Sequence, residues 1–278
     1  MLRVGLIGYP VGHSLSPSFQ QPALDALGIE ARYDLWPTPP DEVPDRIMSL
    51  REPDVLGANV TVPHKAAVVR FLDEVSASGQ RAGAVNTVIP RAGRLLGENT
   101  DIYGLARSLR EAGLDAPGFS AILLGAGGAA RGAVLALESL GAAQITVANR
   151  TLDRADALLA LVPEISGEAL ALNADGALRE VFRHADVVIN ATSLGWNDED
   201  IPIDRGFLDE LPSLAVVMDL TYRETPFLAA ARARGLATID GLPMLVYQGA
   251  RSFELWTGRD APVELMMAAA LEARSTSS

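Results

Sequence analysis

The stretch that decides the fold of this chain is Ala121-Ile122-Leu123-Leu124-Gly125-Ala126-Gly127-Gly128-Ala129-Ala130. Four apolar residues typical of a buried strand run into a glycine turn, and the turn opens a segment with the apolar spacing of a helix. The turn matches the dinucleotide fingerprint with alanine in its third position. In that fingerprint the first glycine permits a tight turn, the second lets the backbone approach a pyrophosphate, and the last small residue keeps helix and strand close.

Free N–H groups at the start of the following helix would hold the anion. The sequence therefore predicts a cofactor site at Gly125, Ala126, Gly127, Gly128 and Ala129. A tight packing turn without a ligand is the alternative, because glycine-rich turns also serve packing alone.

The next predicted strand indicates which dinucleotide is bound. An NAD site usually carries Asp or Glu about 20 residues after the turn, but here the strand ends in Asn149-Arg150-Thr151, with Arg154 one helical step further. Two guanidinium groups and a hydroxyl suit a 2′-phosphate. We therefore predict NADP as cofactor; a solvated helix face is the alternative for the two arginines.

Strand-like and helix-like segments alternate on both sides of the turn, which favours an α/β fold with parallel sheets. After residue 117 we expect a doubly wound half-sheet with strands Ala121–Leu124, Gln144–Ala148 and Val187–Asn190 and helices Ala129–Leu140 and Asp153–Leu161. Further on we expect strands Ala215–Asp219 and Ala237–Ile239 and helices Pro226–Arg234 and Pro243–Trp256, and the sequence leaves open on which domain the last helix, Val263–Ala273, packs. Before it we expect a helix over Pro17–Leu27, ending at Gly28, and strands Val4–Ile7, Tyr33–Trp36, Gly57–Val60 and Val85–Ile89.

Two domains with a cleft between them account for this pattern. We expect a discontinuous α/β substrate-binding and catalytic domain, residues 1–101 plus 240–278, and an inserted Rossmann-type NADP domain, residues 102–239. In the helix Pro243–Trp256 the apolar spacing places Phe253 and Trp256 in the core.

Lys65 is the only lysine among the 23 basic residues. A chain that uses arginine everywhere else but keeps one amine suggests proton transfer, because a guanidinium does not lose its proton near neutrality. Lys65 is therefore our candidate acid/base; a solvated lysine is the alternative.

Other polar residues stand at the ends of predicted strands, where open α/β sheets bind ligands. Ser14 and Ser16 precede the first helix, Asn86 lies in a strand-like run, and Asn99-Thr100-Asp101 precedes a helix. Hydroxyls, amides, a carboxylate and an amine together suit a polyhydroxylated acid. The alternative is helix capping, which we expect of Ser16 in any case.

The composition limits the possible partners. A formal net charge of −12 argues against nucleic acid, and no apolar run reaches the roughly 18 residues that would span a membrane. The chain has no cysteine, which fits a reducing compartment such as the cytoplasm, and it lacks metal-ligand spacing. We expect a small-molecule substrate; the sequence leaves open whether the chain is a monomer or a homodimer.

Eight motifs, in order and with matching separations from Gly8 to Gly258, resemble the shikimate dehydrogenase family. They are Ser14-Leu-Ser-Pro, Asn59-Val-Thr-Val-Pro-His-Lys65, Gly83-Ala-Val-Asn86-Thr87, Asn99-Thr-Asp101, the glycine turn, Asn149-Arg-Thr, Asn190-Ala-Thr-Ser and Gly241-Leu-Pro-Met-Leu-Val-Tyr-Gln248.

The resemblance implies NADPH-dependent reduction of 3-dehydroshikimate to shikimate, on the chorismate route to aromatic amino acids. It implies Lys65 and Asp101 as the catalytic pair. It also implies substrate contacts at Ser14, Ser16, Asn59, Thr61, Asn86, Tyr222 and Gln248, nicotinamide contacts at Leu220 and Gly241, and NADP contacts at the glycine turn, Asn149, Arg150, Thr151 and Arg154. The competing interpretations are an NAD-preferring quinate/shikimate dehydrogenase, a dehydrogenase of another hydroxy acid and a catalytically silent NADP-binding sensor.

Three positions depart from the family pattern. The segment from Tyr222 to Thr225-Pro226 is short, Trp196 stands where a methionine or smaller residue is more frequent, and Gly249 replaces a common alanine.

Overall fold

The structure is a computed structural model that describes residues 1–195 and 200–276. The chain divides into two compact units: unit 1 comprises Met1–Gly104 and Leu245–Ser278, and unit 2 comprises Leu105–Met244. Trp196 lies outside the described residues.

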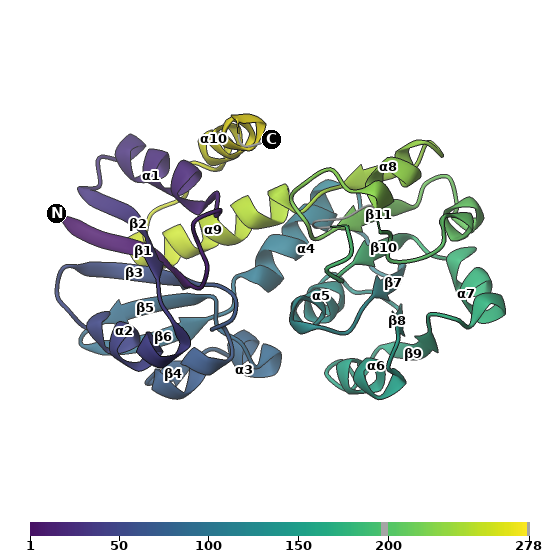
Figure 1. Cartoon of the computed structure of the whole chain (residues 1–278), viewed down its shortest axis with the longest axis horizontal. Helices are drawn as coiled ribbons and strands as arrows, with labels where there is room; N and C mark the ends of the chain where they lie inside the picture. The colour runs from purple at the N-terminus through teal and green to yellow at the C-terminus, as the bar shows by residue number, and fades with distance from the viewer. Residues whose placement is uncertain (196–199, 277–278) are drawn as a thin grey trace. The chain divides into compact units, whose positions relative to one another are not determined.

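Within its described residues, unit 2 contains a parallel sheet of six strands in the order β12-β11-β10-β7-β8-β9 (Figure 1). The strands are β7 (Ser120–Leu124), β8 (Gln144–Asn149), β9 (Ser166–Ala171), β10 (Val187–Asn190), β11 (Val216–Asp219) and β12 (Ala237–Ile239). The chain returns past its first strand, β7, to add β10 on the other side, so the order reverses between these two strands. This is the doubly wound topology predicted from the sequence, and its switch point is where such sheets bind ligands.

The crossovers of unit 2 are α5 (Gly128–Ser139), α6 (Leu152–Leu159), α7 (Asp175–Phe182), the short η3 (Arg205–Glu210) and α8 (Pro226–Arg232). Strand β9 and helix α7 were not predicted. The core that packs against the sheet includes Leu124 and Val188 from the strands and Phe182, Phe207 and Phe227 from the crossovers.

Unit 1 contains a mixed sheet with the order β2-β1-β3-β5-β6-β4. Its strands are β1 (Leu2–Gly8), β2 (Ala31–Pro37), β3 (Val55–Val60), β4 (Glu74–Val75), β5 (Thr87–Arg91) and β6 (Arg94–Glu98). The sheet is mixed because β5 runs antiparallel to both β3 and β6, a reversal that the strand pattern of the sequence does not predict. A two-residue turn with positive φ at Ala92 (50°) and Gly93 (78°) closes the β5–β6 hairpin, as type I′ turns do.

The helices that lie wholly in unit 1 are α1 (Ser16–Ala26), α2 (Val43–Ser49), α3 (Ala77–Ala82) and α10 (Val263–Thr276). Two short 3₁₀ turns, η1 (Pro40–Glu42) and η2 (Ala67–Phe71), accompany them. Helices α4 (Asp101–Glu111) and α9 (Leu242–Thr257) continue across the boundaries of the two units. The sequence did not assign the last helix, Val263–Ala273, to a domain; in the structure α10 packs against α1 (Figure 1).

Two glycines let helix α9 pack closely, Gly57 against the mixed sheet and Gly249 against α1. A Cβ at Gly57 would lie 2.2 Å from the Trp256 ring, whose Nε1 donates to Val88 O at 3.0 Å. A Cβ at Gly249 would lie 2.6 Å from the Phe19 ring, which accounts for glycine in place of the more common alanine. Phe253 and Trp256 are buried, as the sequence predicts.

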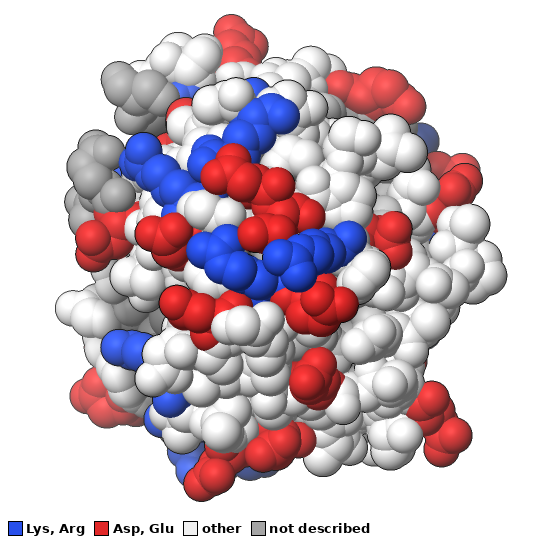
Figure 2. Space-filling view, turned by 90° about the vertical axis from the view of Figure 1, so that its right-hand side faces the viewer, with Lys and Arg blue, Asp and Glu red and all other residues white. Residues whose placement is uncertain are grey.

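Charged side chains of both signs lie next to one another on the face shown in Figure 2. In unit 2, Arg179 and Arg183 both pair with Glu210, and they hold the pKa of its carboxyl below the ordinary value. Arg234 does the same to Asp209. In residues 1–195 and 200–276 no helix combines the length and the hydropathy needed to cross a membrane.

Candidate active site

The reversed direction of β5 brings the predicted polar residues of unit 1 to one edge of the sheet. Asn59, near the end of β3, pairs with Thr87 at the start of β5, and Thr87 also pairs with Glu98 at the end of β6. Asn86 and the segment Asn99-Thr100-Asp101 therefore meet at the edge where β3 ends. Parallel pairing would have placed Asn86 at the opposite edge.

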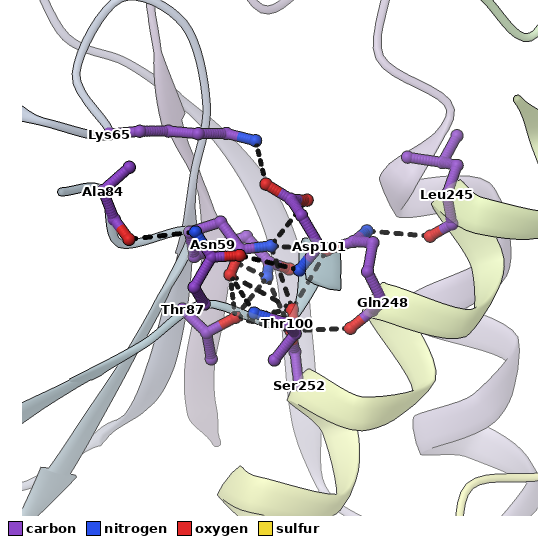
Figure 3. Close-up of polar contacts among 11 residues, drawn as sticks. Asn59, Lys65, Ala84, Thr87, Thr100, Asp101, Leu245, Gln248 and Ser252 are labelled. Carbon is purple, nitrogen blue, oxygen red and sulfur yellow. Dashed lines mark hydrogen bonds and ion pairs between the residues drawn. The ribbon is translucent and has the colours of Figure 1, made fainter. Parts of the chain in front are cut away.

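Lys65 and Asp101 lie together at this edge (Figure 3). The Nζ of Lys65 is 2.6 Å from Oδ2 of Asp101, and the two side chains are 31% and 18% exposed. The Lys65 carbonyl accepts from Val85 N at 2.8 Å, and the amide N of Asp101, the first residue of α4, donates to Asn99 Oδ1 at 3.1 Å. Backbone contacts thus fix both members of a partly solvated ion pair.

Asn86 binds the second carboxylate oxygen of Asp101. Its Nδ2 donates to Asp101 Oδ1 at 2.9 Å and to Gln248 Oε1 at 3.1 Å, while its Oδ1 accepts from Thr100 N at 2.7 Å. A backbone N–H can only donate, so this contact determines which end of the amide is the oxygen. Asn86 is therefore a fixed donor to Asp101.

A buried polar cluster supports these residues, and the sequence did not single out all of it. The cluster comprises Asn59, Asn86, Thr87, Thr100, Gln248 and Ser252 (Figure 3). Ser252 Oγ lies 2.7 Å from Thr87 Oγ1, accepts from Asn59 Nδ2 at 3.0 Å and donates to Gln248 O at 3.0 Å. The sequence feature that could have identified Ser252 is its position four residues after Gln248, which places both polar residues on the same face of a largely apolar helix.

Ser14 and Ser16 also lie together, although Ser16 does not cap α1 as predicted. The N-cap is Leu15 and Ser16 is the first helical residue. Ser14 Oγ accepts from Ser16 N at 3.2 Å and donates to Ser16 Oγ at 3.1 Å. Thr61 directly follows β3, where its N–H donates to Ile7 O at 2.8 Å.

His64, in the loop before Lys65, is buried. Its Nε2 lies 2.7 Å from Thr38 O, which ties the loop before Lys65 to the residue that follows β2. A carbonyl oxygen can only accept, so Nε2 carries the proton. The residue has a structural role at the loop.

In unit 2 the glycine turn has the geometry that the fingerprint requires. Gly125 has φ +97°, and a Cβ there would lie 2.8 Å from Thr192 Cγ2. A Cβ at Gly127 or Gly128 would meet nothing within 4 Å, and α5 starts at Gly128 without a capping side chain. Ala126 and Ala129 flank this open surface, and Ala130 is fully buried. The turn therefore presents free backbone N–H groups to an approaching anion.

Asn149, Arg150, Thr151 and Arg154 follow β8, the strand next to β7. Asn149 Nδ2 donates to Thr151 O at 2.8 Å, and Thr151 is the N-cap of α6 without a capping hydrogen bond from its side chain. Arg150 and Arg154 are exposed, and no ion pair of either occurs in the described part of the chain. The two guanidinium groups are available to a phosphate.

Leu220 and Gly241 also meet in unit 2. A Cβ at Gly241 would lie 2.2 Å from Leu220 O, and Gly241 N donates to Thr221 O at 2.9 Å. The buried Asp219 fixes this region by accepting from Asn190 Nδ2, Thr221 N and Thr225 Oγ1 at 2.9–3.0 Å. Tyr222 is partly buried, and desolvation raises the pKa of its phenol.

The doubly wound sheet, the open glycine turn and the exposed arginines are the features of a protein that binds a phosphorylated dinucleotide. The amine–carboxylate pair of unit 1 is suited to proton transfer. Together they define the class: a pyridine-nucleotide-dependent dehydrogenase. Among the described residues, no three His, Cys, Asp or Glu side chains gather in a group that could hold a metal ion.

Comparison with known proteins identifies the family within this class. Residues 6–88 match the family described as Shikimate dehydrogenase substrate binding domain. Residues 109–196 match Shikimate / quinate 5-dehydrogenase, and residues 241–271 match Shikimate 5'-dehydrogenase C-terminal domain. A shikimate dehydrogenase (NADP(+)) of Symbiobacterium thermophilum is 42% identical over 277 residues, covering 97% of this chain and 94% of that protein. The chain belongs to the shikimate dehydrogenase family.

Solved structures agree with this assignment. The shikimate 5-dehydrogenase of Thermus thermophilus in complex with NADP(H) and shikimate has a TM-score of 0.87 at 40% identity, covering 98% of this chain and 100% of that one. The quinate dehydrogenase of Corynebacterium glutamicum in complex with NAD has a TM-score of 0.88 at 30% identity, covering 98% and 99%.

Proposed function

We propose that this chain is an NADP-dependent shikimate dehydrogenase, which reversibly reduces 3-dehydroshikimate to shikimate on the route to chorismate and the aromatic amino acids. The observation that carries this proposal is the contact of 2.6 Å between Lys65 Nζ and Asp101 Oδ2 in a member of this family. Unit 1 is the substrate-binding and catalytic part and unit 2 the NADP-binding part.

Lys65 and Asp101 perform the proton transfer. When bound, NADPH supplies the hydride that reaches the substrate carbonyl carbon. Negative charge then develops on the carbonyl oxygen, where the Lys65 ammonium stabilises it and donates a proton. In the oxidation of shikimate, the neutral Lys65 amine accepts the proton from the hydroxyl. Asp101, bound by Asn86 on its other oxygen, orients the ammonium.

The remaining predicted residues bind and orient the two reactants. Ser14 and Ser16 bind the substrate carboxylate, and its ring hydroxyls are bound by Asn59, Thr61, Asn86, Tyr222 and Gln248. The open backbone at Gly127 and Gly128 fits a pyrophosphate, because a side chain there would occupy that space. Arg150, Arg154 and Thr151 bind the 2′-phosphate, Asn149 contacts the adjoining ribose, and Leu220 and Gly241 contact the nicotinamide.

An NAD-preferring quinate/shikimate dehydrogenase is the closest competing function, because a quinate dehydrogenase in complex with NAD shares the fold. The exposed Arg150 and Arg154 favour NADP, since a guanidinium binds phosphate oxygens through charge-assisted hydrogen bonds. The reducing interior of the cell, where a biosynthetic enzyme meets NADPH, is the expected location.

A panel of four assays tests the proposal. The purified protein is given shikimate or quinate with NADP⁺ or NAD⁺, and formation of the reduced cofactor is followed by absorbance. We expect the highest kcat/KM with shikimate and NADP⁺. A preference for quinate with NAD⁺ would establish the competing function. No turnover in any pair, with NADP⁺ still bound, would refute the proposal and leave a dehydrogenase of another hydroxy acid or the silent sensor.

A further inference from the structure

The hydroxyl of Tyr33 lies between two groups of proposed substrate contacts, and the proposed mechanism gives it no role. Tyr33 is in β2, only 4% of its surface is exposed, and its ring is tilted against that of Trp256 at a centroid distance of 6.5 Å. The phenol donates to Asn59 Oδ1 at 2.8 Å. Burial raises the pKa of the Tyr33 phenol, and a hydrogen bond from Ser16 acts in the opposite direction. The group is therefore a neutral hydroxyl that donates to Asn59.

The Asn59 amide has no proton left for a ligand. Its Nδ2 donates to Ser252 Oγ at 3.0 Å and to Asn86 O at 3.2 Å, with Thr87 Oγ1 as a third neighbour at 3.4 Å. An amide nitrogen carries two protons, and both acceptors belong to the buried polar cluster. The Oδ1 atom has two lone pairs, of which Tyr33 occupies one. Asn59 can therefore offer a ligand only a hydrogen-bond acceptor.

Hydroxyl groups of unit 1 lie near this acceptor. Ser14 donates to Ser16 at 3.1 Å, Ser16 lies near enough to the Tyr33 phenol to influence its pKa, and Tyr33 donates to Asn59. The serines are the proposed contacts of the substrate carboxylate, and Asn59 is a proposed contact of a ring hydroxyl. Tyr33 is the residue that joins the two.

We propose that Tyr33 is a positioning residue that fixes the Asn59 amide so that its oxygen accepts a hydrogen bond from a substrate hydroxyl. The inference rests on the proposed function, because it assigns the polarity of one of the shikimate contacts. Without the phenol, Oδ1 loses its buried donor. The contacts of Nδ2 with Asn86 O and Ser252 Oγ still determine which end of the amide is the oxygen, but Oδ1 is no longer held in the position from which it accepts from the substrate hydroxyl.

The variant Tyr33→Phe tests this role, because it removes one oxygen and keeps the ring. We expect the KM for shikimate to rise about 10-fold, as for a buried hydrogen bond left without its donor, while kcat and the KM for NADP⁺ change by less than about twofold. The control Tyr103→Phe removes a phenol from an exposed ring of unit 1 and should leave all three constants unchanged. An unchanged KM for shikimate in Tyr33→Phe would overturn the proposal, and so would equal changes in both KM values, which indicate a general packing defect.

Two further measurements test the same role, and the second does not require Tyr33→Phe to fold. In the Asn59→Ala background Tyr33→Phe should add nothing to the KM for shikimate, whereas additive effects would show that the two residues act separately. The unchanged protein can be inhibited with shikimate analogues that carry fluorine or hydrogen in place of single ring hydroxyls. At one position fluorine should weaken binding as much as hydrogen does, because fluorine cannot donate to Asn59. Tolerance of fluorine at every position would refute an acceptor at Asn59. If the unchanged protein does not oxidise shikimate, the proposed function fails independently of Tyr33.

Discussion

Replacing Lys65 with methionine should separate a catalytic role from a structural one, because the two roles predict effects of different size. The Lys65–Asp101 pair keeps access to solvent, with the two side chains 31% and 18% exposed. Ion pairs of this kind contribute at most about 1 kcal/mol to the free energy of unfolding. A general acid contributes about 10²–10⁴-fold to turnover, which corresponds to about 2.7–5.5 kcal/mol of transition-state stabilisation.

We therefore expect Lys65→Met to lower kcat for shikimate oxidation by at least about 100-fold, while NADP⁺ binding and the urea midpoint of unfolding stay close to those of the unchanged protein. The rate of absorbance change at saturating cofactor gives kcat, and cofactor binding is measured by fluorescence titration with NADPH. Lys65→Arg should also be slow, because a guanidinium keeps the charge but does not exchange its proton near neutrality.

The matched control is Arg51→Met, which breaks another partly exposed ion pair of unit 1. Arg51 and Asp73 are 2.8 Å apart and 27% and 32% exposed. This variant should lose a similar amount of stability and keep its turnover. If Lys65→Met turns over within about threefold of the unchanged protein, or if both variants lose activity alike, Lys65 is not the general acid.

Three other predictions concern the cofactor, the polar cluster and the pH. Arg150→Ala should weaken NADP⁺ binding by about 1.5–3 kcal/mol with little effect on NAD⁺, as measured by the ratio of the two KM values; equal losses would place the phosphate elsewhere. Ser252→Ala should destabilise the protein by about 1–3 kcal/mol in urea unfolding, because the Asn59 amide loses its best buried acceptor. The control Thr257→Val removes a similar hydroxyl-to-carbonyl bond from the same helix and should lower the free energy of unfolding by less. Arg51 holds the pKa of Asp73 below its ordinary value, so the native state binds fewer protons than the unfolded state. The stability difference between Arg51→Met and the unchanged protein should therefore shrink as the pH falls from about 3.9 through the lowered pKa of Asp73; a difference as large at pH 2 as at pH 7 would contradict this.

The parallel sheet of unit 2 could be predicted because its central strands are short, apolar and rich in β-branched residues. Strand β9, Ser166–Ala171, lacks such residues and lies at the sheet edge, where pairing with β8 rather than its own composition makes it a strand. The β5–β6 hairpin was missed because its turn is Ala92-Gly93 instead of the more recognisable Asn-Gly or Asp-Gly. Without the hairpin, no pattern in the sequence predicts a reversed strand.

In the candidate site, the residues that could be predicted carry unusual chemistry, such as the solitary lysine, or belong to a motif. Ser252 and Tyr33 have neither property. A serine in a helix and a tyrosine in a strand are ordinary residues. Only the tertiary fold brings Ser252 of α9 and Tyr33 of β2, a strand separated from β3 by β1, within hydrogen-bond distance of Asn59. Their roles depend on tertiary contacts between residues far apart in sequence, which local patterns do not encode.

The single lysine of this chain also makes it a convenient subject for spectroscopy. In protein grown with isotopically enriched lysine, every side-chain ammonium signal must come from the residue that faces Asp101. No resonance assignment is needed, and no second lysine obscures the spectrum. The protonation of one amine could then be followed by NMR as substrate and cofactor are added.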